Sequence, residues 1–151
     1  MNVLNGVLKA ELGQRPLLGR LHELFEGAGQ QLYLVGGSVR DLLLRRPIQD
    51  YDLATSAEPG KTEKLLRLAK PDALFTIGKK FGTISAKFGE DTVEVTTFRT
   101  EQYEFGDRHP EVEFARSIAE DLVRRDLTIN SMALDPANGD LLDPANGVGD
   151  L

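Results

Sequence analysis

The segment LVGGSVRD at residues 34–41 constrains the fold more than any other part of the chain. The apolar run QLYLV at 31–35 predicts a buried strand, and this strand leads directly into Gly36 and Gly37. The following residues, SVRDLLLRR, predict a short helix that Ser38 begins as its N-cap. Glycine lets the backbone approach a ligand closely, and the N–H groups at a helix start suit phosphate oxygens. The pattern therefore predicts a phosphate-binding turn.

Other interpretations of this turn exist. It can be an ordinary strand-to-helix connection in which Arg40 and Asp41 are surface residues. The common phosphate motifs do not compete with it, because the chain has no G-x-G-x-x-G and the stretch GKKFGT around Lys79 lacks the Walker spacing. The choice between the two interpretations depends on the acidic residues that come next in the sequence.

Asp50 and Asp52 lie shortly after the turn, next to a predicted strand at 51–55. Alternate residues of a strand project from the same face, so the two carboxylates are expected roughly 6 to 7 Å apart at their Cβ atoms. Two carboxylates about 5 Å apart repel by roughly 3 kcal/mol at an effective dielectric near 20, a cost that a shared divalent cation removes. Magnesium suits one or two carboxylates plus substrate phosphates. Without the glycine turn, an Asp-x-Asp pair is more often a solvated turn or a helix cap.

The rest of the chain alternates helix and strand patterns, which predicts a mixed α/β domain. The segment after 98 is polar and contains Gly106 and Pro110, so we expect a long loop there. The pentapeptide DPANG occurs twice, at 135–139 and 143–147, and each copy predicts a tight turn around a small hairpin. The remaining expected elements are helices at 17–25, at 59–69 and from Ser117, strands at 74–77, 83–88 and 92–98, a hairpin turn at 89–91, and the loop at 99–116.

Composition limits the classes of function. With 151 residues, 40% of them apolar, the chain can bury the core of one compact domain. It has no cysteine and only two histidines, so any metal must bind oxygen ligands. A net charge of −6 argues against a surface that holds nucleic acid throughout, although it does not exclude an acidic active site that modifies RNA. We expect a cytoplasmic protein with no membrane partner, because no apolar run approaches the length of a membrane span.

The motifs of the chain resemble those of a known family. LVGGSVRDLLLRRPIQDYDLAT is similar to the signature of the class II tRNA nucleotidyltransferases (CCA-adding enzymes) and bacterial poly(A) polymerases. The likeness continues through FGTISAKFGEDTVEVTTFRTEQY and EDLVRRDLTINSMAL and closes with LLDPANGVGDL, so that it covers nearly everything from Leu32 onward. The resemblance implies a polymerase-beta-like head of the α/β (α+β) class, with a mixed, mostly antiparallel sheet of about five strands packed with helices.

The resemblance also implies roles for the carboxylates. Asp50 and Asp52 would hold two Mg²⁺ ions, and Glu94, within VEVTTFR, would be the third catalytic carboxylate. Strand alternation agrees, because Glu94 is the polar residue between Val93 and Val95. The alternative for Glu94 is an exposed charge on a half-buried strand.

A second implied set binds the nucleotide. A run such as RRD is usually a solvated helix face, and only the family pattern assigns it to the ribose and phosphates. The predicted nucleotide-binding residues are Gly36, Gly37, Ser38, Arg40, Asp41, Arg124, Arg125, Asp126 and Asn130.

The implied function is a template-independent nucleotidyltransferase head. It would transfer CMP or AMP from CTP or ATP to the 3′ end of tRNA by two-metal phosphoryl transfer. The alternatives are the head of a poly(A) polymerase, a nucleotide-binding fragment with little or no catalysis, and a scaffold that binds nothing.

We expect the head to span 1–134, and 135–151 to form a hairpin leading to a neck that is missing from this chain. In the family the neck selects the base through an E-D-x-x-R pattern. EDLVR at 120–124 has those letters but precedes RRD, and we do not assign it that role. The predicted consequences are poor base selectivity and weak turnover by the isolated chain, while the length of the 100–116 loop favours competence for A addition.

Overall fold

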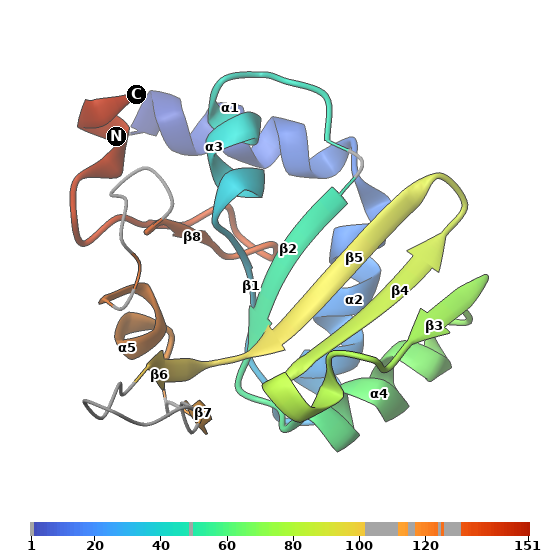
Figure 1. The fold of residues 1–151 in the computed structure, drawn as a ribbon. Helices are drawn as coiled ribbons and strands as arrows, with labels where there is room; N and C mark the ends of the chain where they lie inside the picture. The colour runs from blue at the N-terminus through green and yellow to red at the C-terminus, as the bar shows by residue number, and fades with distance from the viewer. Residues whose placement is uncertain (1, 49, 102–111, 115–116, 124, 126–130) are drawn as a thin grey trace.

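A computed structural model of the chain describes residues 2–48, 50–101, 112–114, 117–123, 125 and 131–151 (Figure 1). Its strands are β1 (Leu32–Val35), β2 (Asp50–Thr55), β3 (Ala73–Phe75), β4 (Thr83–Phe88), β5 (Asp91–Thr97), β6 (Arg99–Glu101), β7 (Val112–Phe114), β8 (Ala133–Leu134) and β9 (Leu141–Leu142). Its α-helices are α1 (Asn2–Gly13), α2 (Pro16–Gly27), α3 (Gly37–Leu43), α4 (Pro59–Leu68) and α5 (Ile118–Val123). Short 3-10 helices are η1 (Lys79–Phe81) and η3 (Gly147–Asp150).

The main sheet has seven strands in the described part of the chain, in the order β3-β4-β5-β2-β1-β8-β9. Its central pair, β2 and β5, runs parallel, and the neighbouring pairs described on either side are antiparallel. This confirms the predicted mixed, mostly antiparallel class. The prediction of about five strands was too low, because β8 and β9 have two residues each and are too short for an alternating pattern to reveal them.

Helices α2 and α4 pack on one face of this sheet, and α1 packs against α2 and α3. Apolar residues of β2 and β5 that alternate in sequence, such as Leu53 and Val95, join the same buried cluster as Phe25 of α2 and Leu66 of α4. Figure 1 shows α2 and α4 behind the sheet. One consequence is that Tyr51, 4% exposed, points into this helical layer, while its neighbours on the strand point to the opposite face.

A smaller apolar cluster covers part of the opposite face. It brings α5 against the sheet, and the ring of Phe98 lies 6.3 Å from that of Tyr33. The buried members of this cluster are Val35, Ala54, Phe98, Ile118, Leu122 and Ala133. Helix α5 is therefore held on the same face as the polar side chains of β2.

Three local predictions were wrong. Helix α1 was not expected, because Gly6 and Gly13 lower its helix propensity, yet Leu8 within it is fully buried in the core. The segment after Phe98 was predicted to be a loop, but it contains the paired strands β6 and β7. Each has three residues, which is too short for a strand pattern to be recognised in the sequence. Strand β3 spans Ala73–Phe75 and not 74–77, and Ile77 is 93% exposed.

The turns predicted at the two DPANG copies are confirmed. The first copy connects β8 to β9, and the Asp135 side chain accepts a hydrogen bond from the Ala137 N–H. In the second copy the Asp143 carboxylate accepts hydrogen bonds from the N–H groups of Gly147 and Val148, the latter at 3.0 Å. Because β9 pairs with β8, residues 141–142 belong to the same sheet as β1 and β2.

Candidate active site

The glycine turn lies where β1 leaves the sheet. Gly36 has φ 64° and ψ −137°, a conformation that residues with a side chain rarely adopt, and α3 begins at Gly37. A Cβ atom at Gly36 would lie 3.3 Å from Nη1 of Arg125 and 3.9 Å from Oδ2 of Asp52. The missing side chain therefore leaves the space in which an arginine and a carboxylate from distant parts of the sequence approach the turn.

The parallel register of β2 and β5 brings the predicted carboxylates together. Asp52 lies opposite Glu94, and Asp50 lies opposite Thr92 at the start of the pair. The buried residues between them in sequence, Tyr51 and Val93, point to the helical layer, so Asp50, Asp52 and Glu94 share the other face. Asp52 is half-buried, whereas Asp50 and Glu94 are exposed.

The electrostatics of Asp52 reflect this crowding. The pKa of Asp52 is raised from the ordinary value of 3.8 to about 6, and burial is the largest cause. The negative charge of Glu94 and a side-chain hydrogen bond with Glu94 contribute to this rise, Asp50 adds a smaller effect, and the positive charge of Arg125 opposes them. A half-buried carboxylate near other negative charges is one whose ionised form a divalent cation would stabilise strongly.

The oxygen ligands fit magnesium, but they do not form a closed cage. Within the described residues, no three acidic or histidine side chains are grouped so as to hold a metal ion by themselves. Magnesium characteristically keeps several waters and takes one or two carboxylates together with substrate phosphates. The donor set around Asp52 therefore suits an ion that arrives with a nucleotide rather than a permanent structural metal.

Two arginines flank the turn. Arg125 donates to the Asp121 carboxylate at 3.1 Å, and its Nε is buried without a hydrogen-bond partner among the described atoms. The Arg40 guanidinium lies over the other glycine, 3.2 Å from where a Cβ of Gly37 would be, and its Nε donates to Asp41 at 3.2 Å. Both cations are thus held by their own carboxylate partners close to the glycine backbone.

Asp121 is a residue of this site that the sequence interpretation missed. It is 1% exposed and belongs to the EDLVR segment, to which no role was assigned. The spacing of four residues between an acid and an arginine was the signal that could have identified the pair. Among the other predicted nucleotide-binding residues, Arg124, Asp126 and Asn130 lie outside the described residues.

The prediction that Ser38 caps α3 was wrong. The N-cap is Gly36, and no side chain caps this helix end. Ser38 lies within the first turn of α3, and its hydroxyl hydrogen bonds to the backbone of Asp50 and Asp52. The helix is also shorter than SVRDLLLRR suggested, since the chain turns at Arg45, which has a positive φ of 55°.

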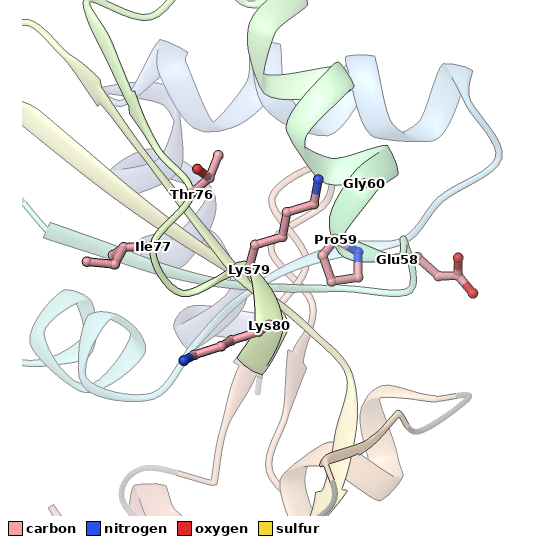
Figure 2. Close-up of a pocket in the computed structure, with 7 residues that line it drawn as sticks. All are labelled: Glu58, Pro59, Gly60, Thr76, Ile77, Lys79 and Lys80. Atoms are coloured by element: carbon pink, nitrogen blue, oxygen red, sulfur yellow. The ribbon is translucent and has the colours of Figure 1, made fainter.

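A separate cavity of about 730 Å³ lies between the start of α4 and the β3–β4 connection (Figure 2). Lys79 extends from η1 toward the first turn of α4, and its ammonium pairs with Glu63 at 3.1 Å. This cavity lies near the last residue of β5, because Gly82, in the connection between β3 and β4, accepts a hydrogen bond from the N–H of Thr97. It contains none of the predicted site residues.

The fold is that of nucleotidyltransferase head domains, as comparison with solved structures shows. The chain superposes on the Bacillus stearothermophilus CCA-adding enzyme in complex with CTP with a TM-score of 0.69 and 39% identity, over 87% of this chain and 29% of that chain. It also matches a tRNA nucleotidyltransferase complexed with a primer tRNA and an incoming ATP analog, with a TM-score of 0.69 and 32% identity, over 86% of this chain and 36% of that one.

The chain belongs to the poly A polymerase head domain family, whose model matches residues 32–151. Curated relatives include the CCA-adding enzyme of Bacillus velezensis, 46% identical over 87% of this chain, and that of Streptococcus gordonii, 45% identical over 85%. The chain spans about a third of the length of these relatives, 32% and 31% respectively. Helices α1 and α2 precede the region that the family model matches.

No helix in the described part of the chain has both the length and the apolar character needed to cross a membrane.

Replacing Gly36 with alanine tests the strained turn. Gly36→Ala should lower the free energy of unfolding by about 1–3 kcal/mol, because the backbone conformation is unfavourable for a side chain and the new Cβ crowds Arg125. Gly19→Ala is the matched control, since Gly19 lies in α2 with open space around it and alanine there should stabilise by about 0.5–1 kcal/mol. Urea unfolding measures both; a neutral Gly36→Ala would contradict the assigned geometry.

The raised pKa of Asp52 predicts a pH-dependent stability in metal-free protein. The folded state keeps the Asp52 proton up to about pH 6, whereas the unfolded state loses it near pH 4, so stability falls as the pH rises between these values. Asp52→Asn removes this loss. Its stability relative to wild type should therefore rise by about 1 kcal/mol from pH 4 to pH 7, a figure reduced for the partial solvent exposure of the carboxyl.

The measurement is urea unfolding in the presence of a chelator across this pH range. Glu90→Gln is the control, because Glu90 is exposed in the hairpin turn between β4 and β5 and carries the same charge. A difference between Asp52→Asn and wild type that does not change with pH would show that Asp52 titrates normally.

Proposed function

We propose that this chain is the catalytic head of a tRNA nucleotidyltransferase that adds CMP and AMP to the 3′ end of tRNA. The observation that carries the proposal is the grouping of Asp50, Asp52 and Glu94 on one sheet face beside the glycine turn. The names of the curated relatives and the nucleotide complexes among the solved neighbours support the same activity. A cytoplasmic location is part of the proposal, because it suits the proposed tRNA substrate.

In this proposal Asp50 and Asp52 hold two Mg²⁺ ions, and Glu94 completes the carboxylate set. When bound, the ions supply Lewis-acid chemistry that acidifies the RNA 3′-hydroxyl and stabilises the charge on departing pyrophosphate. The 3′ oxygen forms a bond to the α-phosphorus, the bond from that phosphorus to the bridging oxygen breaks, and the hydroxyl proton passes to solvent. The parallel pairing of β2 with β5 keeps the three carboxylates on one face throughout.

The residues around the turn would bind the triphosphate. The backbone at Gly36 and Gly37 lets phosphate oxygens approach closely, because no Cβ atom fills the space. Arg40 and Arg125 add positive charge, and their pairing with Asp41 and Asp121 restricts where each guanidinium points. Arg124, Asp126 and Asn130 stay predictions from the family pattern.

We further propose that these residues correspond to the head of the relatives. The chain covers about a third of its curated relatives, so base selection and most contacts with tRNA would depend on regions that correspond to the rest of those proteins. The predicted boundary at 134 precedes β9, which pairs within the head sheet. A poly(A) polymerase head, favoured by the description of the matching family, is the second candidate.

The experiment uses a tRNA that lacks its 3′ end and offers CTP and ATP separately and together. It is run on the chain and on a chimera in which the chain replaces the matching part of the Bacillus subtilis CCA-adding enzyme, which is 46% identical over 125 residues. We expect the chimera to add CMP before AMP. Incorporation of AMP alone in a long run would favour poly(A) synthesis, and a chimera that folds without incorporating either nucleotide would contradict the proposal.

Asp50→Asn and Asp52→Asn in the chimera should each lower incorporation on the order of 10³-fold or more, because metal ions contribute several kcal/mol of transition-state stabilisation. Glu90→Gln, a charge-neutralising change at an exposed turn residue, should leave the rate unchanged. Robust activity in either aspartate variant would refute the assignment of the carboxylates.

A further inference from the structure

Ser38 makes an unusual pair of contacts with the strand that carries the carboxylates. Its hydroxyl donates to the Asp50 carbonyl oxygen at 3.2 Å and accepts a hydrogen bond from the Asp52 N–H at 2.8 Å. The side chain is buried, with 3% exposure. A single side chain of α3 therefore spans the backbone from one aspartate to the next.

These contacts fill a gap in the sheet. The N–H of Ser56, just after β2, donates to the Gln31 carbonyl, just before β1. In a strand every second N–H points the same way, so the N–H groups of Ala54 and Asp52 also point toward β1. Strand β1, however, ends at Val35 and the chain leaves the sheet at Gly36. Without Ser38, the backbone of β2 between the aspartates would have no strand partner on this side.

A hydroxyl suits this gap because it can donate and accept at once. One residue of a parallel neighbouring strand makes the same two contacts, with a carbonyl and with an N–H two residues further along. Ser38 thus replaces a strand residue at the point where the turn must leave the sheet. The chain can therefore leave the sheet at the glycine turn while the backbone from Asp50 to Asp52 keeps its strand conformation.

We infer that Ser38 is a positioning residue that sets the backbone, and hence the separation, of the two carboxylates, and that it is not a nucleotide ligand as the family pattern suggested. The inference rests on the proposed function of those carboxylates. The hydroxyl has one hydrogen, which it donates to Asp50, so none is left for a phosphate oxygen, which can only accept.

The first test measures hydrogen exchange at the Asp52 amide in the chain as it is. Ser38→Ala removes the acceptor of this N–H, and exchange at Asp52 should quicken about tenfold, the equivalent of one hydrogen bond of ordinary strength. Ser38→Thr keeps the hydroxyl and should restore protection, and Ser38→Cys, a weak hydrogen-bonding group, should be intermediate. Unchanged exchange in both Ser38→Ala and Ser38→Cys would overturn the inference.

Ser56→Ala is the matched control for general loss of stability. The Ser56 hydroxyl also makes two hydrogen bonds, with the Gln31 N–H and the Gln30 side chain, but just beyond the other end of β2. It should leave Asp52 exchange unchanged. Equal acceleration at Asp52 in Ser56→Ala and Ser38→Ala would indicate a structural role without local positioning.

The second test separates positioning from nucleotide binding. In the chimera, Ser38→Ala should lower kcat about tenfold and raise the Mg²⁺ concentration needed for half-maximal rate about threefold to tenfold, with the KM for CTP unchanged. Loss of a nucleotide ligand would instead raise the KM for CTP. A raised KM with unchanged kcat would overturn the inference. Hydrogen exchange needs neither metal nor substrate, so it tests the role of Ser38 even if the proposed function is wrong. Failure of the proposed function would be seen as a wild-type chimera that incorporates no nucleotide.

Discussion

The parallel pairing of β2 with β5 is the constraint on which the rest of the site depends. It sets Asp52 opposite Glu94 in a sheet whose other described pairs are antiparallel, and it places both carboxylates on the face away from the α2–α4 layer. Burial of Tyr51, Leu53, Val93 and Val95 fixes this orientation, because a shift of one residue would turn the apolar side chains out of the core. Packing of the apolar side chains in the core thus holds the carboxylates close together, although burial of a carboxylate disfavours its charged form.

The elements around this pair are arranged to bring positive charge to the same place. Helix α5 packs on the carboxylate face through Ile118 and Leu122, and it delivers Arg125 to the space left by Gly36. Asp121 pairs with Arg125, so the arginine is held without neutralising Asp52 completely. The result is a partly buried group of charges that a metal-bound triphosphate complements.

The sequence allowed prediction of the local parts of this arrangement. Strand patterns in the sequence predicted β1, β2, β4 and β5, and a glycine turn followed by an acidic pair predicted which residues would cluster. The register of β2 against β5 could not be predicted, because strand partners are chosen by contacts far apart in sequence. The role of Ser38 escaped for the same reason: its residue type favoured a helix cap, whereas its partners are backbone groups twelve and fourteen residues away. Asp121 was missed because its burial depends on how α5 packs.

The most direct test of the account is where a divalent ion binds. Mn²⁺ added in small amounts to the ¹⁵N-labelled chain broadens the amide signals of residues near the ion. The account predicts that signals from Asp50, Asp52, Glu94 and Gly36 broaden first while those of α4 stay sharp, and that Asp52→Asn abolishes this order. Broadening that begins elsewhere, or that is unchanged in Asp52→Asn, would contradict it.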